Sequence, residues 1–441
     1  MTYEKGQKII EGKTKIVWEI KGDSQNVIIE NKNDITAFDD PSFTKQFQSK
    51  AEYATTVTCR VFELLKKAGI PVAYNEQYST NEFSVPKCTM IPLEVVERRF
   101  AVGSYLKRHP EFVQAENSLP HRFHKLIVEF FLKTTKGGLN NAKGENILQG
   151  LDPLKGEEDP YITNPLDSDW KLYHSKKPSW VEEADIQKTV KANNVFPEYS
   201  PEMIKKIEEI SRKTFLTLEG AWNTLGFRLI DMKIEFGIDL EGNLVVADVI
   251  DNDSWRLRDM DWKELSKEAF RQGEALDEVE KKYGYVASLV QNFRIPKQAL
   301  VLWRGSDGDT WLDLNILKDI NGLSIEEITL SGHKSTQLCL HKLDEIIGCF
   351  PDSGVIITKV GRSNGLGPIV AARTIWPVIT IPATIDTFPE DLWSSVRMPS
   401  NVPLATVWPE ANAILLAAEI LAQKNPLIYQ RRQFIIEGQD E

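Results

Sequence analysis

The segment DMKIEFGIDLEGNLVVADVIDNDSWR at residues 231–256 contains seven carboxylates and only two basic side chains. Asp231, Lys233 and Glu235 alternate with apolar residues, which is typical of a β-strand with one polar and one apolar face. The turn LEGN returns the chain through LVVADVI and brings Asp248 close to the polar face if the two strands form a hairpin. Grouped carboxylates with one lysine suit a nucleotide-bound Mg²⁺, which takes one or two protein carboxylates together with phosphate oxygens and water. The alternative is an exposed strand with solvated charges.

A second set of candidate residues follows three apolar runs nearer the C-terminus. Gly305, Ser306, Gly308 and Asp309 come after the first run, SGHK comes after the second, and GRSNGLGP comes after the third. Free backbone N–H groups at such turns can hold a phosphate. If the runs are parallel strands, the turns meet at the carboxyl edge of one sheet, where such sheets bind ligands. Taken alone, each is better explained as a plain tight turn.

The elements before residue 294 predict an α+β domain. Strand-like runs such as TKIVWEI and NVIIEN are mixed with the helical stretch AEYATTVTCRVFELLKKAG, and PEMIKKIEEISRKTFLTLEGAWNTLG is an amphipathic helix that ends near Gly226. Residues 133–180 are rich in Gly, Asn, Pro, Asp and Lys and predict a long loop, whereas residues 257–292 predict helix. The stretch RIPKQ at 294–298 is the predicted domain boundary.

After RIPKQ the pattern changes to a regular alternation of strands and helices. The strand-like runs ALVLW, IEEITL, GVIITKV and PVITIPA are separated by helical patterns such as TWLDLNILKDI and TQLCLHKLDEIIG. This alternation predicts an α/β domain with a parallel sheet covered by helices on both faces. The stretch PEANAILLAAEILAQ predicts an apolar helix suited to packing on a partner subunit.

Composition narrows the classes of function. The 441 residues carry 53 Lys+Arg against 64 Asp+Glu, a net charge of -11, which argues against broad electrostatic binding to nucleic acid or to an anionic membrane. No apolar run approaches the ~18 residues of a membrane helix, and MTYEKGQKII lacks a signal-peptide core, so we expect a cytosolic protein. The four cysteines are scattered and suggest neither a disulfide framework nor a zinc site.

The hairpin motif DMKIEFG…DVIDNDSWR resembles the phosphoribosylaminoimidazole-succinocarboxamide (SAICAR) synthetase family of purine biosynthesis. IIEGKTKIVW, CTMIPLEVV and RRFAVGSYLKR resemble the family's opening hairpin, adenine-contacting hinge and substrate-binding segment. The resemblance covers roughly residues 5–265 and implies an ATP-grasp-like α+β domain at 1–262, followed by a helical linker at 263–296. One departure is KTTKGG with a long insertion before Asp159, where the family commonly has Lys-Asp-Asp followed closely by Asp-Pro.

This resemblance implies roles for individual residues in an ATP-driven amide synthesis. In that reaction a phosphorylated carboxylate of the substrate is attacked by the amine of L-aspartate, and Mg²⁺ and lysines offset the developing charge. The implied residues are, for ATP, Lys13, Lys15, Met90 and the catalytic Lys233; for the metal, Glu235 and Asp248; and for the imidazole nucleotide and aspartate, Arg98, Ser104, Asp231, Asp253 and Arg256.

The motifs of the C-terminal part resemble aminoimidazole ribonucleotide (AIR) carboxylase, of the animal type that uses CO₂ directly. The match covers about residues 297–430 within a domain placed at 297–441, and it implies a three-layer, flavodoxin-like parallel sheet with no metal or organic cofactor. Histidine suits the implied proton transfer because it acts as acid and base near neutral pH. The implied residues are, for catalysis, His333 and Lys334; for the nucleotide, Ser306, Asp309 and Arg397; and for CO₂, Ser363 and Asn364.

Four residues depart from the carboxylase pattern. Gly308 and Gly332 stand where the family usually has Ser and Ala, and Lys359 and Arg373 occupy positions that are usually small or neutral. An inactive carboxylase domain, kept as an oligomerisation scaffold for SAICAR synthetase alone, is therefore one alternative. A different class, an ATP-dependent kinase with an attached nucleotide-binding module, would use the same lysines and carboxylates.

The two families in this order resemble a bifunctional enzyme of purine biosynthesis. The C-terminal domain would carboxylate AIR with CO₂, and the N-terminal domain would join the product, carboxyaminoimidazole ribonucleotide, to L-aspartate with ATP and Mg²⁺. The resemblance also implies a homo-oligomer, an octamer, built around the carboxylase domains. Neither nucleic acid nor a membrane is expected as a partner.

Overall fold

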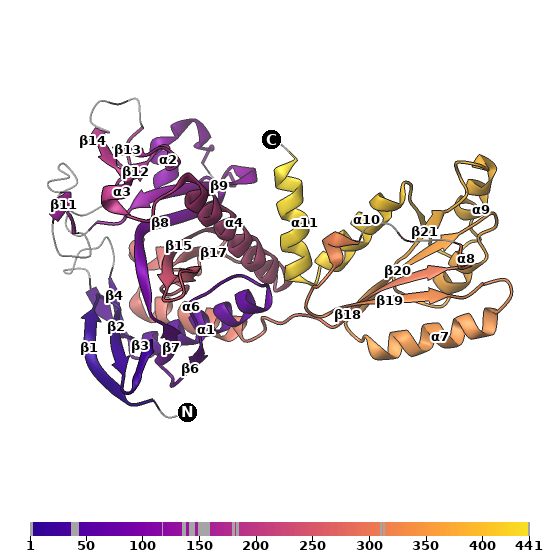
Figure 1. Cartoon of the computed structure of the whole chain (residues 1–441), viewed down its shortest axis with the longest axis horizontal. Coiled ribbons are helices and arrows are strands. Elements are labelled where there is room, and N and C mark those ends of the chain that lie inside the picture. Colours follow the sequence, from indigo (N-terminus) through magenta and orange to yellow (C-terminus); the bar gives the residue numbers. More distant parts are fainter. Residues whose placement is uncertain are drawn as a thin grey trace. The chain divides into compact units, whose positions relative to one another are not determined.

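The computed structural model describes residues 3–36, 44–116, 118–134, 138–140, 146–148, 159–178, 181, 185–308, 311 and 314–439. The chain divides into two units, Met1–Phe293 and Arg294–Glu441 (Figure 1). Residues 263–293, which the sequence placed in a linker, belong to the first unit in this division. Among the described residues, no helix is long and apolar enough to cross a membrane.

The first unit begins with a five-stranded antiparallel sheet in the order β1-β2-β3-β7-β6. The tight turn between the first two strands carries Lys13, and the Gly12 N–H donates to the Lys15 carbonyl at 2.9 Å across it. The strands are β1 (Lys5–Glu11), β2 (Lys15–Ile20), β3 (Asp23–Asn31), β7 (Glu82–Pro86) and β6 (Glu76–Gln77).

A second, eight-stranded sheet positions the acidic segment. The predicted hairpin is confirmed: β15 pairs antiparallel with β16 and sets Glu235 opposite Ala247. The same strand pairs with β8 and β17, and this register places Asp231 opposite both Arg98 and Arg256. The strands are β14 (Asp185–Lys191), β13 (Asp169–Tyr173), β12 (Tyr161–Ile162), β9 (Arg122–Leu132), β8 (Cys88–Phe100), β15 (Arg228–Asp239), β16 (Leu244–Ala247) and β17 (Trp255–Arg258).

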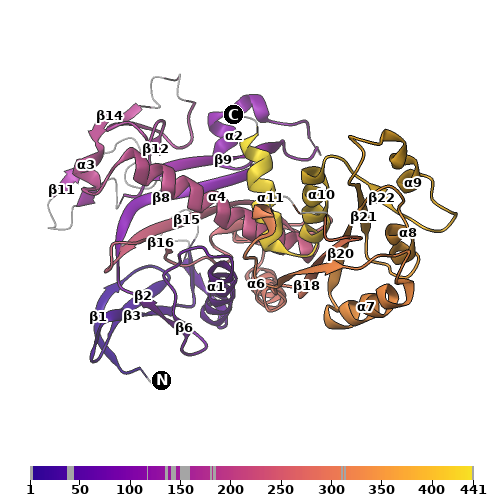
Figure 2. The same cartoon turned by 45° about the vertical axis from the view of Figure 1, so that its right-hand side comes forward.

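Helices cover the apolar face of this sheet. The long helix α4 packs on β8, β9 and β15 (Figure 2), and the Ser200 hydroxyl caps its N-terminus by accepting from the Met203 N–H at 3.1 Å. The helix predicted after residue 49 is confirmed as α1, which packs against α6. The helices are α1 (Lys50–Lys67), α2 (Ser104–Arg108), α3 (Ala192–Val195), α4 (Pro201–Thr224), α5 (Glu268–Arg271) and α6 (Leu276–Val290), with a 3-10 helix at Pro110–Phe112.

The long loop predicted at 133–180 is wrong over part of its length. Strands β12 and β13 lie within it and pair with each other, and β12 also pairs with β9. In DWKLY, Trp170 and Leu172 are fully buried while Lys171 is exposed, so the segment alternates with the period of a strand. Two short pairs complete the described strands of this unit: β4 (Asp34–Thr36) with β5 (Thr44–Gln46), and β10 (Leu139–Asn140) with β11 (Asn146–Leu148).

The second unit is the predicted α/β domain. Its sheet is parallel in the order β19-β18-β20-β21-β22, which by chain order is 2-1-3-4-5, the flavodoxin-like arrangement. The apolar runs are buried because helices cover both faces of the sheet. The strands are β18 (Gln298–Arg304), β19 (Leu323–Thr329), β20 (Ser353–Val360), β21 (Val378–Pro382) and β22 (Ala405–Thr406).

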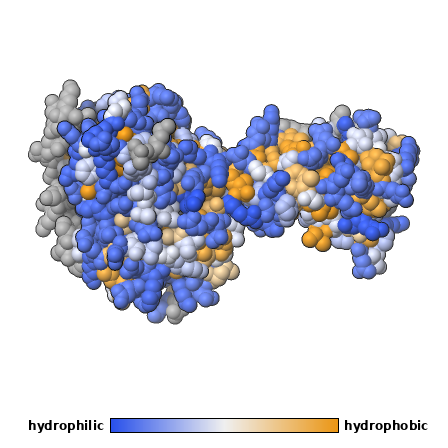
Figure 3. Space-filling view, turned by 90° about the horizontal axis from the view of Figure 1, so that it is seen from below, coloured by the Kyte–Doolittle hydropathy of each residue, from blue (hydrophilic) through white to orange (hydrophobic). Residues whose placement is uncertain are grey.

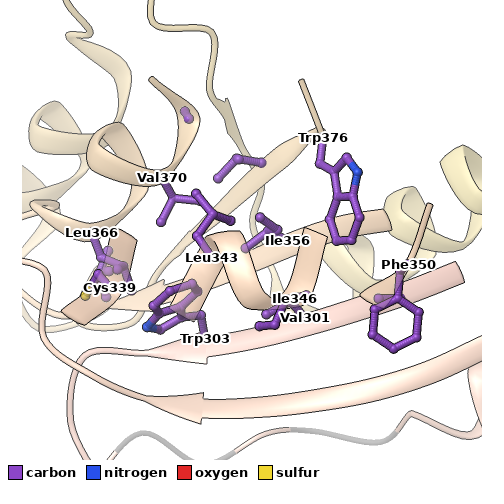
Figure 4. Close-up of a cluster of buried hydrophobic side chains, with 14 residues drawn as sticks. Val301, Trp303, Cys339, Leu343, Ile346, Phe350, Ile356, Leu366, Val370 and Trp376 are labelled. Atoms are coloured by element: carbon purple, nitrogen blue, oxygen red, sulfur yellow. The ribbon is translucent and has the colours of Figure 1, made fainter. Parts of the chain in front are cut away.

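The two faces of this sheet pack against different helices. Val301 and Trp303 of β18 point into a cluster with Leu343 of α7 and Val370 of α8 (Figure 4). Gln298 of the same strand points the other way and donates to the carbonyl of Leu421 in α10 at 3.2 Å. The helices are α7 (Thr336–Cys349), α8 (Leu366–Ala371), α9 (Trp393–Val396), α10 (Glu410–Ala422) and α11 (Pro426–Gly438), with 3-10 helices at Asn315–Leu317 and Pro389–Leu392. The helix predicted from TWLDLNILKDI is wrong where the structure describes it, since only the 3-10 turn at Asn315–Leu317 forms.

Candidate functional site

The polar face of β15 forms one side of a pocket of about 410 Å³ in the first unit. Strand β8, the turn between β1 and β2, the loop after β16 and the region around α5 complete its walls. The pocket contains most of the N-terminal residues selected from the sequence. They are Lys13, Lys15, Arg98, Asp231, Lys233, Glu235, Asp248, Asp253 and Arg256.

A cluster of lysines and carboxylates occupies the end of the pocket nearest Glu235. Lys233 Nζ lies 2.5 Å from Glu94 Oε1 and 3.6 Å from Glu235 Oε1, and Lys133 also pairs with Glu235. Burial alone lowers the pKa of Lys233, but Glu94 and Glu235 outweigh it and raise that pKa above its ordinary value. Burial likewise opposes ionisation of Glu235, but Lys233 and Lys133 lower its pKa. Lys233 and Glu235 are therefore both charged at neutral pH.

Lys15 and Asp248 face each other across the pocket and form an ion pair. Burial lowers the pKa of Lys15 to about 8, despite the opposing effect of Glu235. Asp248 has a backbone φ of 63°, a left-handed conformation that is strained for a residue other than glycine. Backbone strain of this kind is concentrated at functional sites. Lys13 lies on the exposed β1–β2 turn and reaches the same pocket. Three lysines thus point toward one space, the arrangement that a polyphosphate needs.

Glu235 and Asp248 fit a metal that is held jointly with a nucleotide. Both line the pocket, and each is paired with a lysine that a phosphate would attract in its place. No group of three or more His, Cys, Asp or Glu side chains within the described ranges is arranged as a metal site of its own. Two carboxylates beside a phosphate site match the preference of Mg²⁺ for few protein oxygens and several phosphate oxygens or waters.

The other half of the pocket is built around Arg98, Asp231 and Arg256. Asp231 Oδ2 accepts from Arg98 Nη1 at 2.6 Å and from Arg256 Nη1 at 2.7 Å, as the β15 register dictates. Ser104 begins helix α2, and its hydroxyl lies 3.4 Å from Arg98 Nη2. The sequence thus predicted three residues that form one hydrogen-bonded group, with Ser104 beside it.

Asp253 is held by two lysines and a tyrosine. Lys50 Nζ lies 3.2 Å and Lys267 Nζ 3.3 Å from Asp253 Oδ2, and the Tyr283 hydroxyl donates to Oδ1. Burial opposes its ionisation, but Lys267 and Lys50 lower the pKa of Asp253 below its ordinary value. Tyr283 lies in α6, so residues beyond 262 support this wall of the pocket.

Several pocket residues were missed by the sequence reasoning. Glu94 lies two residues from Val96 and four from Arg98, and strand alternation in LEVVERRF places all three on one face. Lys267 and Arg271 line the pocket from a segment that the sequence placed in a linker, and no short-range pattern identifies them.

Asp159 and Met90 differ in how they relate to the pocket. Asp159 lines it, and Thr134 donates to Asp159 Oδ1 from its backbone N–H at 2.6 Å and from its hydroxyl at 3.0 Å. Burial and Glu94 raise the pKa of Asp159 to about 7. Met90 lies on β8 opposite Gly237, is 44% exposed, and is not part of the pocket wall.

In the second unit the selected residues lie in loops that follow the carboxyl ends of parallel strands. Ser306 follows β18, His333 and Lys334 follow β19, and Ser363 follows β20. The 2-1-3-4-5 order makes the edge beside β18 and β20 the switch point at which such sheets bind ligands. Asp309 lies outside the described residues.

Two glycines let the loops after β19 and β20 meet closely. A Cβ on Gly365 would lie 2.3 Å from Nε2 of His333, and a Cβ on Gly332 would lie 2.7 Å from Cα of Leu366. Real Cβ atoms do not approach other atoms that closely, so neither position accepts a side chain without movement of the backbone or the ring. The His333 imidazole therefore lies against the loop that carries Asn364, and the unusual Gly332 fits this contact.

Asn364 organises the loop in which it lies. Its Nδ2 donates to the Thr380 and Ser395 hydroxyls, each at 3.2 Å, and its Oδ1 accepts from the Gly367 N–H at 2.9 Å. The Asn364 backbone N–H also donates to the Ser394 hydroxyl at 3.1 Å, which ties the loop to α9. The selected Arg397 follows α9 directly, and its guanidinium lies over the Trp393 ring at 4.7 Å.

Lys359 is accommodated by an ion pair. It lies near the carboxyl end of β20, and its Nζ is 2.6 Å from Glu410 Oε2 at the start of α10, with both side chains largely buried. The same Nζ lies 5.7 Å from the Trp311 ring centroid. Arg373 is exposed. These two departures are therefore compatible with the fold.

Comparison with known proteins identifies both parts of the chain. The family models for SAICAR synthetase and AIR carboxylase match residues 8–158 with 179–288 and residues 302–439, respectively. A probable multifunctional protein of Caenorhabditis elegans is 32% identical over 439 residues, which cover 96% of this chain and 91% of that protein. A bifunctional phosphoribosylaminoimidazole carboxylase/phosphoribosylaminoimidazole succinocarboxamide synthetase of Drosophila melanogaster is 32% identical over 442 residues, covering 97% of this chain and 92% of that protein. The solved structure of a phosphoribosylaminoimidazole-succinocarboxamide synthase from Ehrlichia chaffeensis is 24% identical to this chain and has a TM-score of 0.49. The match covers 65% of this chain and 100% of that one.

Proposed function

Because the chain belongs to the family of bifunctional AIR carboxylase/SAICAR synthetases of purine biosynthesis, we propose that the 410 Å³ pocket is its ligase site and the loop edge of the second unit its carboxylase site. The observation that carries the ligase assignment is the division of the pocket into a lysine-rich half and an arginine-rich half. The positive charges of these halves complement two anionic ligands, a nucleoside triphosphate and a phosphorylated imidazole nucleotide.

In the ligase step, Lys13, Lys15 and Lys233 bind the phosphates of ATP and stabilise charge that develops on transfer of the γ-phosphoryl group. Glu235 and Asp248 would hold Mg²⁺, which supplies further neutralisation of the phosphate oxygens. Met90 would contact the adenine from the outer part of β8. The substrate carboxylate attacks the γ-phosphorus, ADP leaves, and the carboxylate becomes an acyl phosphate. The amine of L-aspartate then attacks its carbonyl carbon, with phosphate as the leaving group.

The arginine-rich half positions the carboxyaminoimidazole ribonucleotide. Arg98 and Arg256 present guanidinium groups that suit bidentate binding of phosphate or carboxylate, and Ser104 adds a hydroxyl beside them. Asp231 holds the two arginines in register through Oδ2. Asp253, fixed by Lys50 and Lys267, would receive the aspartate amine.

In the carboxylase step, AIR binds at Ser306, Asp309 and Arg397, and no metal or organic cofactor takes part. Its ring carbon attacks CO₂ beside Ser363 and Asn364. The proton on that carbon then passes to His333, with Lys334 alongside.

A Gly103→Ala substitution tests the arginine-rich half. Gly103 has a φ of 59°, and a Cβ there would lie 2.7 Å from Arg256 Nη2. We expect a loss of about 1–2 kcal/mol in unfolding free energy from the strained backbone, together with a raised KM for the nucleotide because Arg256 is displaced. Gly22→Ala is the matched control, since Gly22 has a φ of 78° with no atom within 4 Å. A nucleotide KM that changes equally in both variants contradicts the assignment of Arg256.

The quaternary structure and location are also proposed. The second unit exposes large apolar side chains, and apolar patches are visible on its surface (Figure 3). Such patches commonly mark subunit contacts, which supports a homo-oligomer built on the carboxylase domains. The octamer and the cytosolic location are proposed from the family resemblance. The exposed residues include Leu338, Ile375, Trp393, Val396 and Trp408. Light scattering of the whole chain tests this, and a monomer would contradict it.

An assay of the purified chain tests the proposed function as a whole. With AIR, bicarbonate, ATP, Mg²⁺ and L-aspartate, carboxyaminoimidazole ribonucleotide and then SAICAR are expected, with release of ADP that depends on aspartate. SAICAR formed only from supplied carboxyaminoimidazole ribonucleotide would indicate the scaffold alternative. ADP release without aspartate would indicate the kinase alternative.

A further inference from the structure

A line of alternating charges extends from the pocket into the interior of the first unit. Arg256 and Arg98 share Asp231, and Arg98 Nε donates to Glu129 Oε2 at 2.6 Å. The other oxygen of Glu129 accepts from Arg108. Arg98 and Arg256 line the pocket, whereas Glu129 and Arg108 lie behind it and are 3% exposed. Nothing in the ligase step as derived above uses these two residues.

The hydrogen bonds divide the donors of Arg98 among three directions. Nε is directed to Glu129 and Nη1 to Asp231. Within the described ranges, the only partner of Nη2 is the Ser104 hydroxyl at 3.4 Å, a long and weak contact. The guanidinium is thus fixed by two carboxylates on two sides, and Nη2 stays available on the side of Ser104.

Arg108 keeps Glu129 ionised and in place. Burial opposes the charge on Glu129, but Arg98 and Arg108 together lower its pKa. The Arg108 guanidinium lies over the rings of Tyr161 at 4.8 Å and Phe131 at 5.3 Å, and it donates to the Ser175 carbonyl. Contacts of this kind restrict the side chain, because planar guanidinium groups stack on aromatic faces.

Helix α2 links this interior anchor to the pocket. The helix runs from Ser104 to Arg108, so its first residue lies beside Arg98 Nη2 and its last residue binds Glu129. The Glu129 carboxylate of β9 is bound by Arg98 of β8 and by Arg108, and therefore connects the end of the helix to the strand that carries Arg98.

We propose that Glu129 and Arg108 are positioning residues of the ligase, which orient Arg98 so that Nη2 faces the anionic imidazole nucleotide. This rests on the proposed role of Arg98 in binding that substrate. Without Glu129, Arg98 would direct both Nη1 and Nη2 toward Asp231, because bidentate arginine–carboxylate pairs are favoured. Nη2 would then turn away from Ser104, and the affinity for the nucleotide would fall.

The test is a steady-state analysis of Glu129→Gln in the whole enzyme with ATP, Mg²⁺, aspartate and carboxyaminoimidazole ribonucleotide. The KM for the nucleotide is expected to rise about tenfold or more, as for loss of one hydrogen bond to a charged group. The KM for ATP and the carboxylation rate are expected to stay within about twofold, because neither Glu129 nor Arg108 contacts the lysine cluster.

Glu219→Gln is the matched control. Arg99, the next residue of β8, forms a buried pair with Glu219 at 2.7 Å on the other face of the strand, away from the pocket. This variant is expected to lose thermal stability to a similar extent while its nucleotide KM is unchanged. Equal nucleotide KM values in the Glu129→Gln and Glu219→Gln enzymes would reduce Glu129 to a structural residue and overturn the proposal.

A double-mutant cycle separates the role of Arg108. If Arg108 acts through Glu129, Arg108→Met raises the nucleotide KM in the unmodified enzyme and has no further effect in the Glu129→Gln enzyme. If the effects of the two substitutions on the nucleotide KM are additive, Arg108 acts independently of Glu129, and the proposal is contradicted. If Glu129→Gln is not recovered folded, Arg108→Lys, which keeps the charge but not the planar group, serves as the second probe, and an unchanged nucleotide KM overturns the proposal.

Arg98→Lys distinguishes this inference from the proposed function beneath it. A raised nucleotide KM in Arg98→Lys with a normal one in Glu129→Gln contradicts only the positioning role. A normal nucleotide KM in Arg98→Lys contradicts the assignment of the arginine-rich half itself.

Discussion

Replacing Glu235 with Gln, or Asp248 with Asn, is expected to abolish SAICAR formation and to leave carboxylation of AIR intact. Each change keeps the shape of the side chain and removes one negative charge that pairs with the lysines of the pocket. Lys133 and Lys233 lose their common partner when Glu235 becomes Gln, and Lys15 loses its partner when Asp248 becomes Asn. The proposed nucleotide-bound Mg²⁺ would lose a ligand in either case.

The expected loss is at least about 10³-fold in kcat/KM of the ligase step, since transfer of a phosphoryl group depends almost entirely on positioning and charge stabilisation. The measurement is SAICAR formation from supplied carboxyaminoimidazole ribonucleotide, with AIR carboxylation followed separately. Glu241→Gln, in the exposed turn of the same hairpin, is the control and is expected to behave as the unmodified enzyme. Ligase turnover at the normal rate in either pocket variant would contradict the metal assignment.

Replacing His333 with Asn is expected to impair carboxylation of AIR and to leave the ligase reaction intact. Asparagine has a similar volume and can hydrogen bond, but it does not titrate, so removal of the acid–base group should slow carboxylation of AIR by ~10²-fold or more. The ring lies against Gly365 in the loop that Asn364 organises, which is the place where the resemblance to the carboxylase locates CO₂. SAICAR synthesis from supplied carboxyaminoimidazole ribonucleotide should continue at the normal rate.

His341 provides the control for this prediction. It lies on the exposed side of α7, 3.2 Å from Glu345, and its replacement with Asn should leave both reactions unchanged. Normal carboxylation by His333→Asn would make His333 a structural residue. An unmodified protein without carboxylation would instead mark the second unit as the degenerate scaffold.

The alternation of polar and apolar residues in the strands allowed most of the pocket residues to be predicted from the sequence. Asp231, Lys233 and Glu235 alternate with apolar residues, and a one-residue shift in register would bury the charges in the core, so their common face was strongly determined. The same alternation in LEVVERRF would have identified Glu94. Lys267 and Arg271 could not be found in this way, because the tertiary packing of residues 263–293, whose helix α6 lies against α1, brings them to the pocket.

Two other differences have physical causes. DWKLY was hidden within a segment whose Gly, Pro and Asn content favours loops, although burial of Trp170 and Leu172 against neighbouring strands outweighs that local preference. In the sequence, Gly332 departs from the carboxylase pattern and was one reason to consider an inactive carboxylase domain. Its close approach to Leu366 is a tertiary contact that composition cannot predict.

Complementation between two inactive variants tests most directly the central claim that one chain carries two separate, consecutive sites. With AIR, limiting bicarbonate, ATP, Mg²⁺ and L-aspartate, Glu235→Gln alone should accumulate carboxyaminoimidazole ribonucleotide, and His333→Asn alone should form SAICAR about 10²-fold more slowly than the unmodified enzyme. An equimolar mixture of the two should form SAICAR from AIR, because the intermediate made at the carboxylase site of one variant is used at the ligase site of the other. A mixture that stays as inactive as its components, or either variant alone converting AIR to SAICAR at the normal rate, would contradict the claim.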